Sequence, residues 1–243
     1  MLETTSDAVW VAGVDGCPGG WLVVGWQPST GIVARRVAST FEAVLRATQD
    51  AAYVGVDMVI GLPDVAQPGG RTCDRDARAL LGHPRSSSVF SPPVAEALAA
   101  QSHKEASAIN RASGPDAPGL TIQAWHLIPK MRAVQRAMSP ARQERIREVH
   151  PECAFYALND DAPMAASKHT ADGRSARARL LRALFPSIED AMRQYPTRVA
   201  AATDVLDAHA VCAVAGAMHE GDARRVPRNP SRNNRGLRME IWY

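Results

Sequence analysis

The chain has 243 residues, of which 46% are hydrophobic and 22% are charged, and its formal net charge is +3. This length and balance are typical of one globular α/β domain, or at most two small ones, and exclude a fibrous or disordered protein. The weak positive charge is compatible with a polyanionic partner but does not by itself indicate one.

Cysteine usage and hydropathy exclude several other classes. No two cysteines form a CxxC pair, so neither a zinc ribbon nor a disulfide framework is expected. Met1–Asp7 is too short and polar for a signal peptide, and no apolar run reaches the roughly 20 residues of a membrane span. We therefore expect a cytoplasmic protein with no membrane partner, of unknown oligomeric state.

The first predicted element is a strand buried on both faces. Val9–Val14 is wholly apolar or glycine and ends at Asp15, and Gly16–Gly20 supplies a turn. An ionised aspartate at the end of a buried strand is costly unless a cation, a set of hydrogen bonds or a tight turn compensates it. Asp15 is therefore the first candidate site residue.

The next segments predict a mixed sheet. Trp21–Trp26 and Ile32–Ala38 are predicted to form a meander with the first strand, and Ser39 and Glu42 have the spacing of a capping box for a following helix. A fourth apolar strand, Tyr53–Ile60, carries Asp57. This order favours a fourth strand parallel to the first, which would place both aspartates near the carboxyl end of the sheet.

After Asp64 the sequence changes to Arg-rich segments with helical spacing, separated by proline and glycine. This pattern predicts a helical insertion over about residues 64–141 of a single domain, 1–243. Helices are expected over Thr72–Leu81, Val94–Ala112 and Thr121–Met138, the last interrupted by Pro129. Arginines around the first of these helices have the spacing to share one face. They are either a solvated face or part of a phosphate-binding surface.

The last third of the chain adds three more carboxylates. A strand over Arg145–Val149 contains Glu148, a basic helix covers Arg174–Phe185, and Thr203–Gly221 is the strongest predicted helix. Its first turns present Asp204 and Asp207 on one face. Residues Leu237–Tyr243 alternate as an edge strand does.

These carboxylates come from distant segments and predict a shared cation site. Several carboxylates without Cys or His ligands are typical of Mg²⁺ or Mn²⁺ coordination, and two such ions can clamp a phosphodiester during hydrolysis. The candidate metal ligands and catalytic residues are Asp15, Asp57, Glu148, Asp204 and Asp207. The alternative is a purely structural role for two of these acids: Asp15 would only form a turn, and Asp204 would only cap its helix.

The motifs GVDGCPGGW, DMVIGLP, RTCDRDARALLGHPRSSSVFSPP, EVHPE, DVLDA and GLRMEIWY together cover nearly the whole chain. In this combination the chain resembles the family of predicted RNase H-like nucleases called domain of unknown function 429. The resemblance implies a ribonuclease H-like sheet flanked by helices. It is also similar to resolvase-type nucleases, whose acids on the first strand and last helix match Asp15 and the Asp204/Asp207 pair. His209 stands where the family is expected to have an apolar residue.

The favoured function is therefore metal-dependent hydrolysis of nucleic acid, DNA or RNA. Basic residues of the insertion would hold the phosphates, and the candidates are Arg71, Arg78, Arg85 and Lys130. One alternative is a phosphotransferase of the actin-like type, which begins each of its two halves with a similar hairpin, although only one such half is present. Another is a non-catalytic binding or regulatory protein on the same fold.

Overall fold

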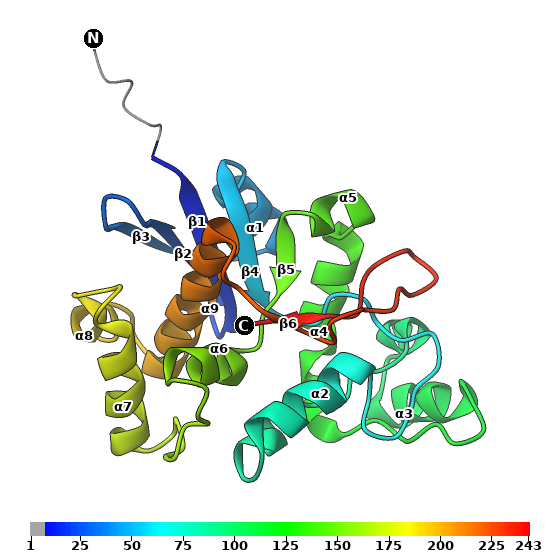
Figure 1. Ribbon diagram of the computed structural model, residues 1–243. Helices are drawn as coiled ribbons and strands as arrows, with labels where there is room; N and C mark the ends of the chain where they lie inside the picture. Colours follow the sequence, from blue (N-terminus) through cyan, green and yellow to red (C-terminus); the bar gives the residue numbers. More distant parts are fainter. Residues whose placement is uncertain (1–7) are drawn as a thin grey trace. The chain divides into compact units, whose positions relative to one another are not determined.

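The structure, a computed structural model, describes residues 8–243 (Figure 1). Residues 1–7, where the sequence predicts no signal peptide, lie outside the described residues. The chain divides into two compact units. The sheet unit runs to Asp57 and resumes over Ala165–Ala223, and the helix-rich unit comprises Met58–Met164 and Arg224–Tyr243. Among residues 8–243, no helix combines the length and the hydrophobicity needed to cross a bilayer.

Four strands form the sheet of the sheet unit, in the order β3-β2-β1-β4. Their bounds are β1 (Trp10–Cys17), β2 (Gly20–Gln27), β3 (Ile32–Ala38) and β4 (Ala51–Asp57). The first three pair antiparallel, and β4 pairs parallel to β1, as the sequence predicts. Asp15 and Asp57 are register partners at the carboxyl ends of β1 and β4. Because paired residues point to the same face, the two carboxylates share one side of the sheet.

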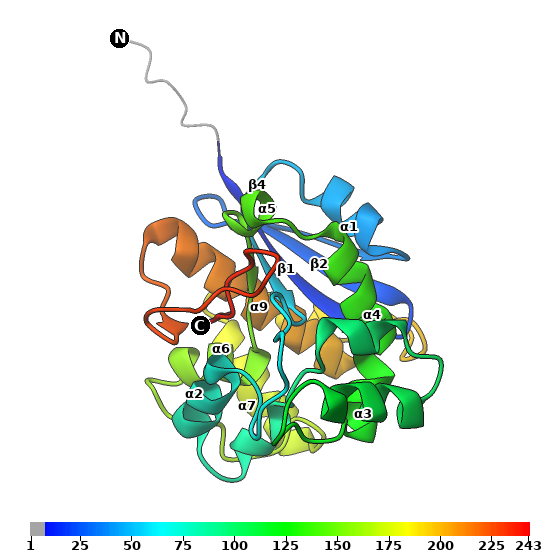
Figure 2. The same ribbon diagram turned by 90° about the vertical axis from the view of Figure 1, so that its right-hand side faces the viewer.

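Four helices belong to the same unit, and two of them cover opposite faces of the sheet (Figure 2). On one face, Phe41 packs edge-on against Trp21 with ring centroids 5.0 Å apart. On the other, Gly216 lies against Trp26, and this is the face that carries the aspartates. The helices are α1 (Phe41–Ala47), α7 (Ala171–Leu181), α8 (Ile188–Ala191) and α9 (Ala202–Glu220). The predicted α/β class with a mixed sheet flanked by helices is confirmed, and it is consistent with a ribonuclease H-like fold.

Two helices, α1 and α7, begin at other residues than predicted, because in each a threonine hydroxyl caps the first turn. The predicted capping residue Ser39 is wrong by one position, because the side chain of Thr40 accepts the hydrogen bond from the Ala43 N–H at 3.2 Å. Thr170 caps α7 in the same way, so this helix begins three residues before the predicted Arg174. A capping oxygen satisfies an N–H group that would otherwise lack an intrahelical partner.

The helix-rich unit contains the whole of the predicted insertion, about residues 64–141. Its elements are α2 (Thr72–Leu81), two 3₁₀ turns η1 (Arg85–Ser88) and η2 (Ala95–Ala99), α3 (His103–Ala112), α4 (Ile122–Ala137), α5 (Pro140–Gln143), β5 (Ile146–Glu148), α6 (Pro151–Leu158), β6 (Arg225–Val226) and β7 (Ile241–Trp242). The single helix expected over Val94–Ala112 is wrong, because Ser102 caps a new helix after η2. The edge strand expected over Leu237–Tyr243 is limited to the two residues of β7. A single domain with an insertion at about 64–141 stays a prediction.

A glycine in β1 allows α9 to approach the sheet closely. A Cβ atom at Gly13 would lie 2.2 Å from the carbonyl oxygen of Ala208 and 2.3 Å from the backbone nitrogen of Cys212. Both atoms belong to the backbone of α9, so they cannot move aside as a flexible side chain would. The absence of a side chain at Gly13 therefore sets the distance between β1 and α9.

We expect Gly13→Ala to lower the free energy of unfolding by about 3 kcal/mol or more, because the added methyl group forces β1 and α9 apart. Urea unfolding monitored by circular dichroism would measure the loss. Gly25→Ala is the matched control in β2, where the new Cβ would meet the Trp10 ring at an ordinary 3.4 Å. Equal stabilities of the two variants would contradict the close contact.

Candidate metal centre

Three aspartates converge in the sheet unit. Asp15 lies near the end of β1, Asp57 is the last residue of β4, and Asp207 lies in the second turn of α9. One oxygen of each carboxylate lies within 4.8 Å of the others. Of the five acids from which the sequence predicts a shared cation site, the structure therefore brings together these three, from the first strand, the fourth strand and the last helix. We call these three residues the aspartate triad.

Burial makes the triad electrostatically costly. Asp15 and Asp207 are only 5% and 3% exposed, and Asp57 is half-buried. Burial raises the pKa of Asp15 well above its ordinary value, and the negative charges of Asp57, Asp207 and Asp204 raise it further. A group in this position gains from any cation that binds beside it.

Lys168 supplies one such cation from within the chain. Its ammonium group donates to Oδ2 of Asp207 at 2.5 Å. Burial lowers the pKa of Lys168, but the charge and hydrogen bond of Asp207, with the charges of Asp57 and Asp15, raise it above its usual value overall. Lys168 stands in a polar segment without a motif, so no pattern in the sequence marks it as a site residue. Its one signal is rarity, since the chain has lysine only at positions 104, 130 and 168.

Asp204 lies one turn before Asp207 and has a capping role. Its Oδ2 accepts a hydrogen bond from the Ala201 N–H at 2.8 Å, which stabilises the start of α9. Burial raises the pKa of Asp204, whereas this hydrogen bond lowers it. Asp204 adds negative charge near Asp15 but is not one of the three acids whose oxygens meet within 4.8 Å. A role for Asp204 as a ligand stays a prediction.

His209, on the same helix, is fixed as a neutral hydrogen-bonding residue. Arg35 of β3 donates from Nε to His209 Nε2 at 2.9 Å, so the ring proton must be on Nδ1, which contacts the Val205 carbonyl at 2.6 Å. Burial lowers the pKa of His209 to about 3, and the nearby Arg35 charge acts in the same direction. His209, which stands where an apolar residue is expected, thus links α9 to β3 through its hydrogen bond with Arg35.

The donor set of the triad fits a hard divalent cation. It offers carboxylate oxygens from three different elements, and their mutual repulsion is relieved by a positive charge. Among the described residues, no cysteine or histidine belongs to this group. The triad could therefore hold a metal ion, and oxygen donors favour Mg²⁺ or Mn²⁺ over softer ions.

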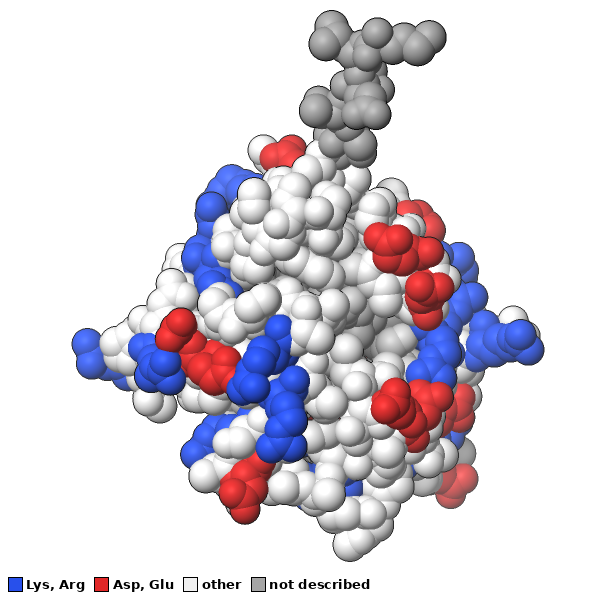
Figure 3. All heavy atoms as spheres, turned by 60° about the vertical axis from the view of Figure 1, so that its left-hand side comes forward, with Lys and Arg blue, Asp and Glu red and all other residues white. Residues whose placement is uncertain are grey.

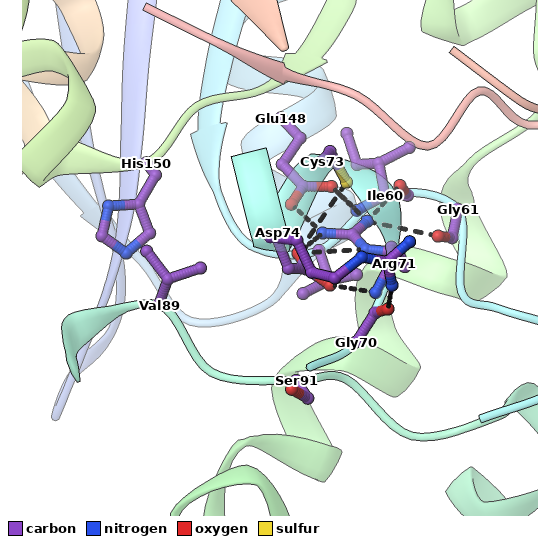
Figure 4. A network of polar contacts seen from close by, with 12 residues as sticks. Ile60, Gly61, Gly70, Arg71, Cys73, Asp74, Val89, Ser91, Glu148 and His150 are labelled. Atoms are coloured by element: carbon purple, nitrogen blue, oxygen red, sulfur yellow. Dashed lines mark hydrogen bonds and ion pairs between the residues drawn. The ribbon is translucent and has the colours of Figure 1, made fainter. Parts of the chain in front are cut away.

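Glu148 lies in the helix-rich unit, within a buried ion network (Figure 4). Arg71 donates to both oxygens of Glu148, at 2.5 and 2.8 Å, and also to Asp74 at 2.7 Å. The Ile60 N–H donates to Glu148 as well, at 2.7 Å. Burial raises the pKa of Glu148 to about 7, and the charge and hydrogen bonds of Arg71 oppose this rise. Glu148 already has cationic and N–H partners, and its role as a metal ligand stays a prediction.

The predicted phosphate-binding residues also lie in the helix-rich unit. Arg71 is 4% exposed and further donates to the carbonyls of Ile60 and Gly61. Arg78 donates to the Val89 carbonyl and to Ser91, at 2.9 and 3.0 Å. The remaining candidates lie on η1 and α4 and are Arg85 and Lys130. On the face drawn in Figure 3, basic and acidic side chains occur in small interspersed groups. A phosphate contact for these residues stays a prediction.

A family model described as "Protein of unknown function (DUF429)" matches residues 13–232. The chain belongs to this family. The match includes every acid of the triad as well as Glu148 and Asp204, and it confirms the resemblance given by the sequence motifs. A search of curated proteins and a search of solved structures gave no match. Membership of DUF429 assigns no reaction, so the chemistry must be argued from the site.

Without metal, the raised pKa of Asp15 gives Asp15→Asn a characteristic pH dependence. Between the ordinary pKa of 3.8 and the raised one, the folded chain binds more protons than the unfolded chain, so stability falls as pH rises through this interval. We expect Asp15→Asn, in EDTA at pH 8, to be more stable than wild type by on the order of 1 kcal/mol or more. The gain should shrink at pH 5. Urea unfolding would measure both, and a loss of stability at pH 8 would contradict it.

Removing Arg71 should destabilise the protein strongly, because two buried carboxylates would lose their shared partner. We expect Arg71→Met to lower the free energy of unfolding by about 3–5 kcal/mol. Arg75→Met, at an exposed position in the first turn of α2, is the control and should cost less than about 1 kcal/mol. Urea unfolding would measure both losses. Similar losses for the two variants would show that the buried network contributes no more to stability than an exposed arginine does.

Proposed function

We propose that the protein is a metal-dependent nuclease, which hydrolyses phosphodiester bonds of DNA or RNA. The observation that carries this proposal is the convergence of Asp15, Asp57 and Asp207. Their carboxylate oxygens lie within 4.8 Å of one another, near the carboxyl ends of β1 and β4. Three acids from separate elements are costly to bury together without a cation, and the sequence provides them at positions where ligand sites of α/β sheets gather.

The triad would hold Mg²⁺ or Mn²⁺, each acid offering one oxygen. When bound, such an ion supplies Lewis-acid activation of a phosphate group and a more acidic water molecule. Asp15 and Asp57 are fixed by their register in neighbouring strands, so neither has to move far to meet a ligand. Lys168 holds the Asp207 carboxylate in place through its hydrogen bond to Oδ2.

The nucleic-acid substrate is supported by the sequence resemblance to predicted RNase H-like nucleases and by the weakly basic net charge of +3. Arg78, Arg85 and Lys130 stay predicted phosphate contacts. Arg71 is not retained, because its guanidinium is buried and donates to four protein partners: Asp74, Glu148, Ile60 and Gly61.

Asp57→Asn should remove both metal binding and hydrolysis while it preserves the size of the side chain. We expect the wild-type protein to gain thermal stability from added Mn²⁺, because a ligand of the folded state alone raises stability. The variant should lose this gain. Its cleavage of labelled single- and double-stranded DNA and RNA should fall by about 10³-fold, since loss of the ion removes several kcal/mol of transition-state stabilisation.

The matched control is Asp50→Asn, which changes an exposed acid just before β4. It should keep both the Mn²⁺ response and the activity. A wild-type protein whose melting temperature does not respond to Mn²⁺ or Mg²⁺ would contradict the metal site. A normal metal response with no cleavage of any of the four nucleic acids would contradict the nuclease and favour a binding or regulatory protein.

A further inference from the structure

Lys168 reaches the triad from a different part of the sheet unit than the acids do. It precedes α7, and its ammonium contacts Asp207 from that side. The side chain is 30% exposed, so part of it keeps contact with solvent. With three N–H donors, it can hold Asp207 and still donate to an oxygen of a bound phosphate.

The backbone that carries Lys168 is firmly anchored. Arg177 is fully buried, and its Nη1 donates to the carbonyls of Ala166 and Gly173, both at 3.0 Å. A Cβ at Gly173 would lie 1.8 Å from the Ser167 carbonyl oxygen, so only glycine permits this approach. The position of Lys168 is therefore set by α7 rather than by the ion pair alone, and this is the preorganisation that a functional group requires.

Formal charge favours one divalent ion in this environment. The three carboxylates and the Lys168 ammonium together carry a charge of minus two, which a single divalent cation balances. The ammonium also contacts Oδ2 of Asp207, which makes this oxygen less available as a ligand or bridge for a second ion. The sequence-based expectation of two ions did not include this lysine.

We propose that Lys168 fills the second cation position of the centre, so that the triad binds one divalent ion and the ammonium group serves beside it. The inference rests on the proposed metal site and specifies its composition. In the proposed nuclease, the ammonium of this partly exposed side chain would contact a non-bridging oxygen of the substrate phosphate, as a point charge does.

Counting bound Mn²⁺ tests this composition directly. Equilibrium dialysis at saturating Mn²⁺, with the free ion measured by electron paramagnetic resonance, should give one ion per wild-type chain. Lys168→Ala should bind two ions, because the change frees Oδ2 of Asp207, opens space and leaves an additional negative charge. Lys168→Arg should keep one ion, since it retains the positive charge.

Lys104→Ala is the control, because Lys104 is an exposed lysine of the helix-rich unit, and it should bind one ion. Two ions in the wild-type protein would overturn this inference and leave the proposed metal site intact. No bound ion in the wild-type protein would overturn both. One ion in a folded Lys168→Ala variant, at any affinity, would show that Lys168 does not hold a cation position. If that variant does not fold, the wild-type count still decides between one ion and two.

Discussion

The close packing of α9 against β1 is the constraint on which the candidate site depends. Gly13 lets the helix backbone approach the strand at a distance that any side chain would prevent. Asp15 stands two residues further along β1, on the same face, and Asp207 directly precedes Ala208, the residue of α9 that Gly13 approaches. Arg35 and His209 add a second tie between the helix and the sheet. The aspartate triad thus follows from this helix–strand contact together with the parallel register that places Asp57 of β4 beside Asp15.

The protein compensates its buried acids in two different ways. In the helix-rich unit, Arg71 pairs with both Glu148 and Asp74 through a set of short hydrogen bonds, and backbone N–H and carbonyl groups complete the network. In the sheet unit, three carboxylates share one lysine, which leaves net negative charge at the centre. In the first cluster both acids contact the guanidinium directly and the formal charge is minus one, which suits a structural role, whereas the triad with its lysine carries minus two and is poised to bind a cation.

This contrast separates the family motifs by role. Two motifs, RTCDRDAR and EVHPE, supply the partners of the buried ion network, Arg71, Asp74 and Glu148. The motifs GVDG, DMVIGLP and DVLDA supply the triad. All of them contain acids that look equally suited to metal binding in the sequence. Only the partners of each acid distinguish a carboxylate that is already neutralised from one that is not.

The sequence by itself determined the α/β class, the strand order at the start of the chain and the convergence of Asp15 and Asp57. These follow from local patterns, because apolar runs, turn residues and a meander leave few ways to pair the strands. Only the tertiary structure showed that Lys168 meets Asp207, that Arg71 pairs with Glu148, and that Asp204 caps its own helix while Asp207 joins the triad. Each of these depends on contacts between residues distant in sequence or on side-chain direction within one helical turn. Charge compensation is decided by such distances, and no spacing along the chain encodes them.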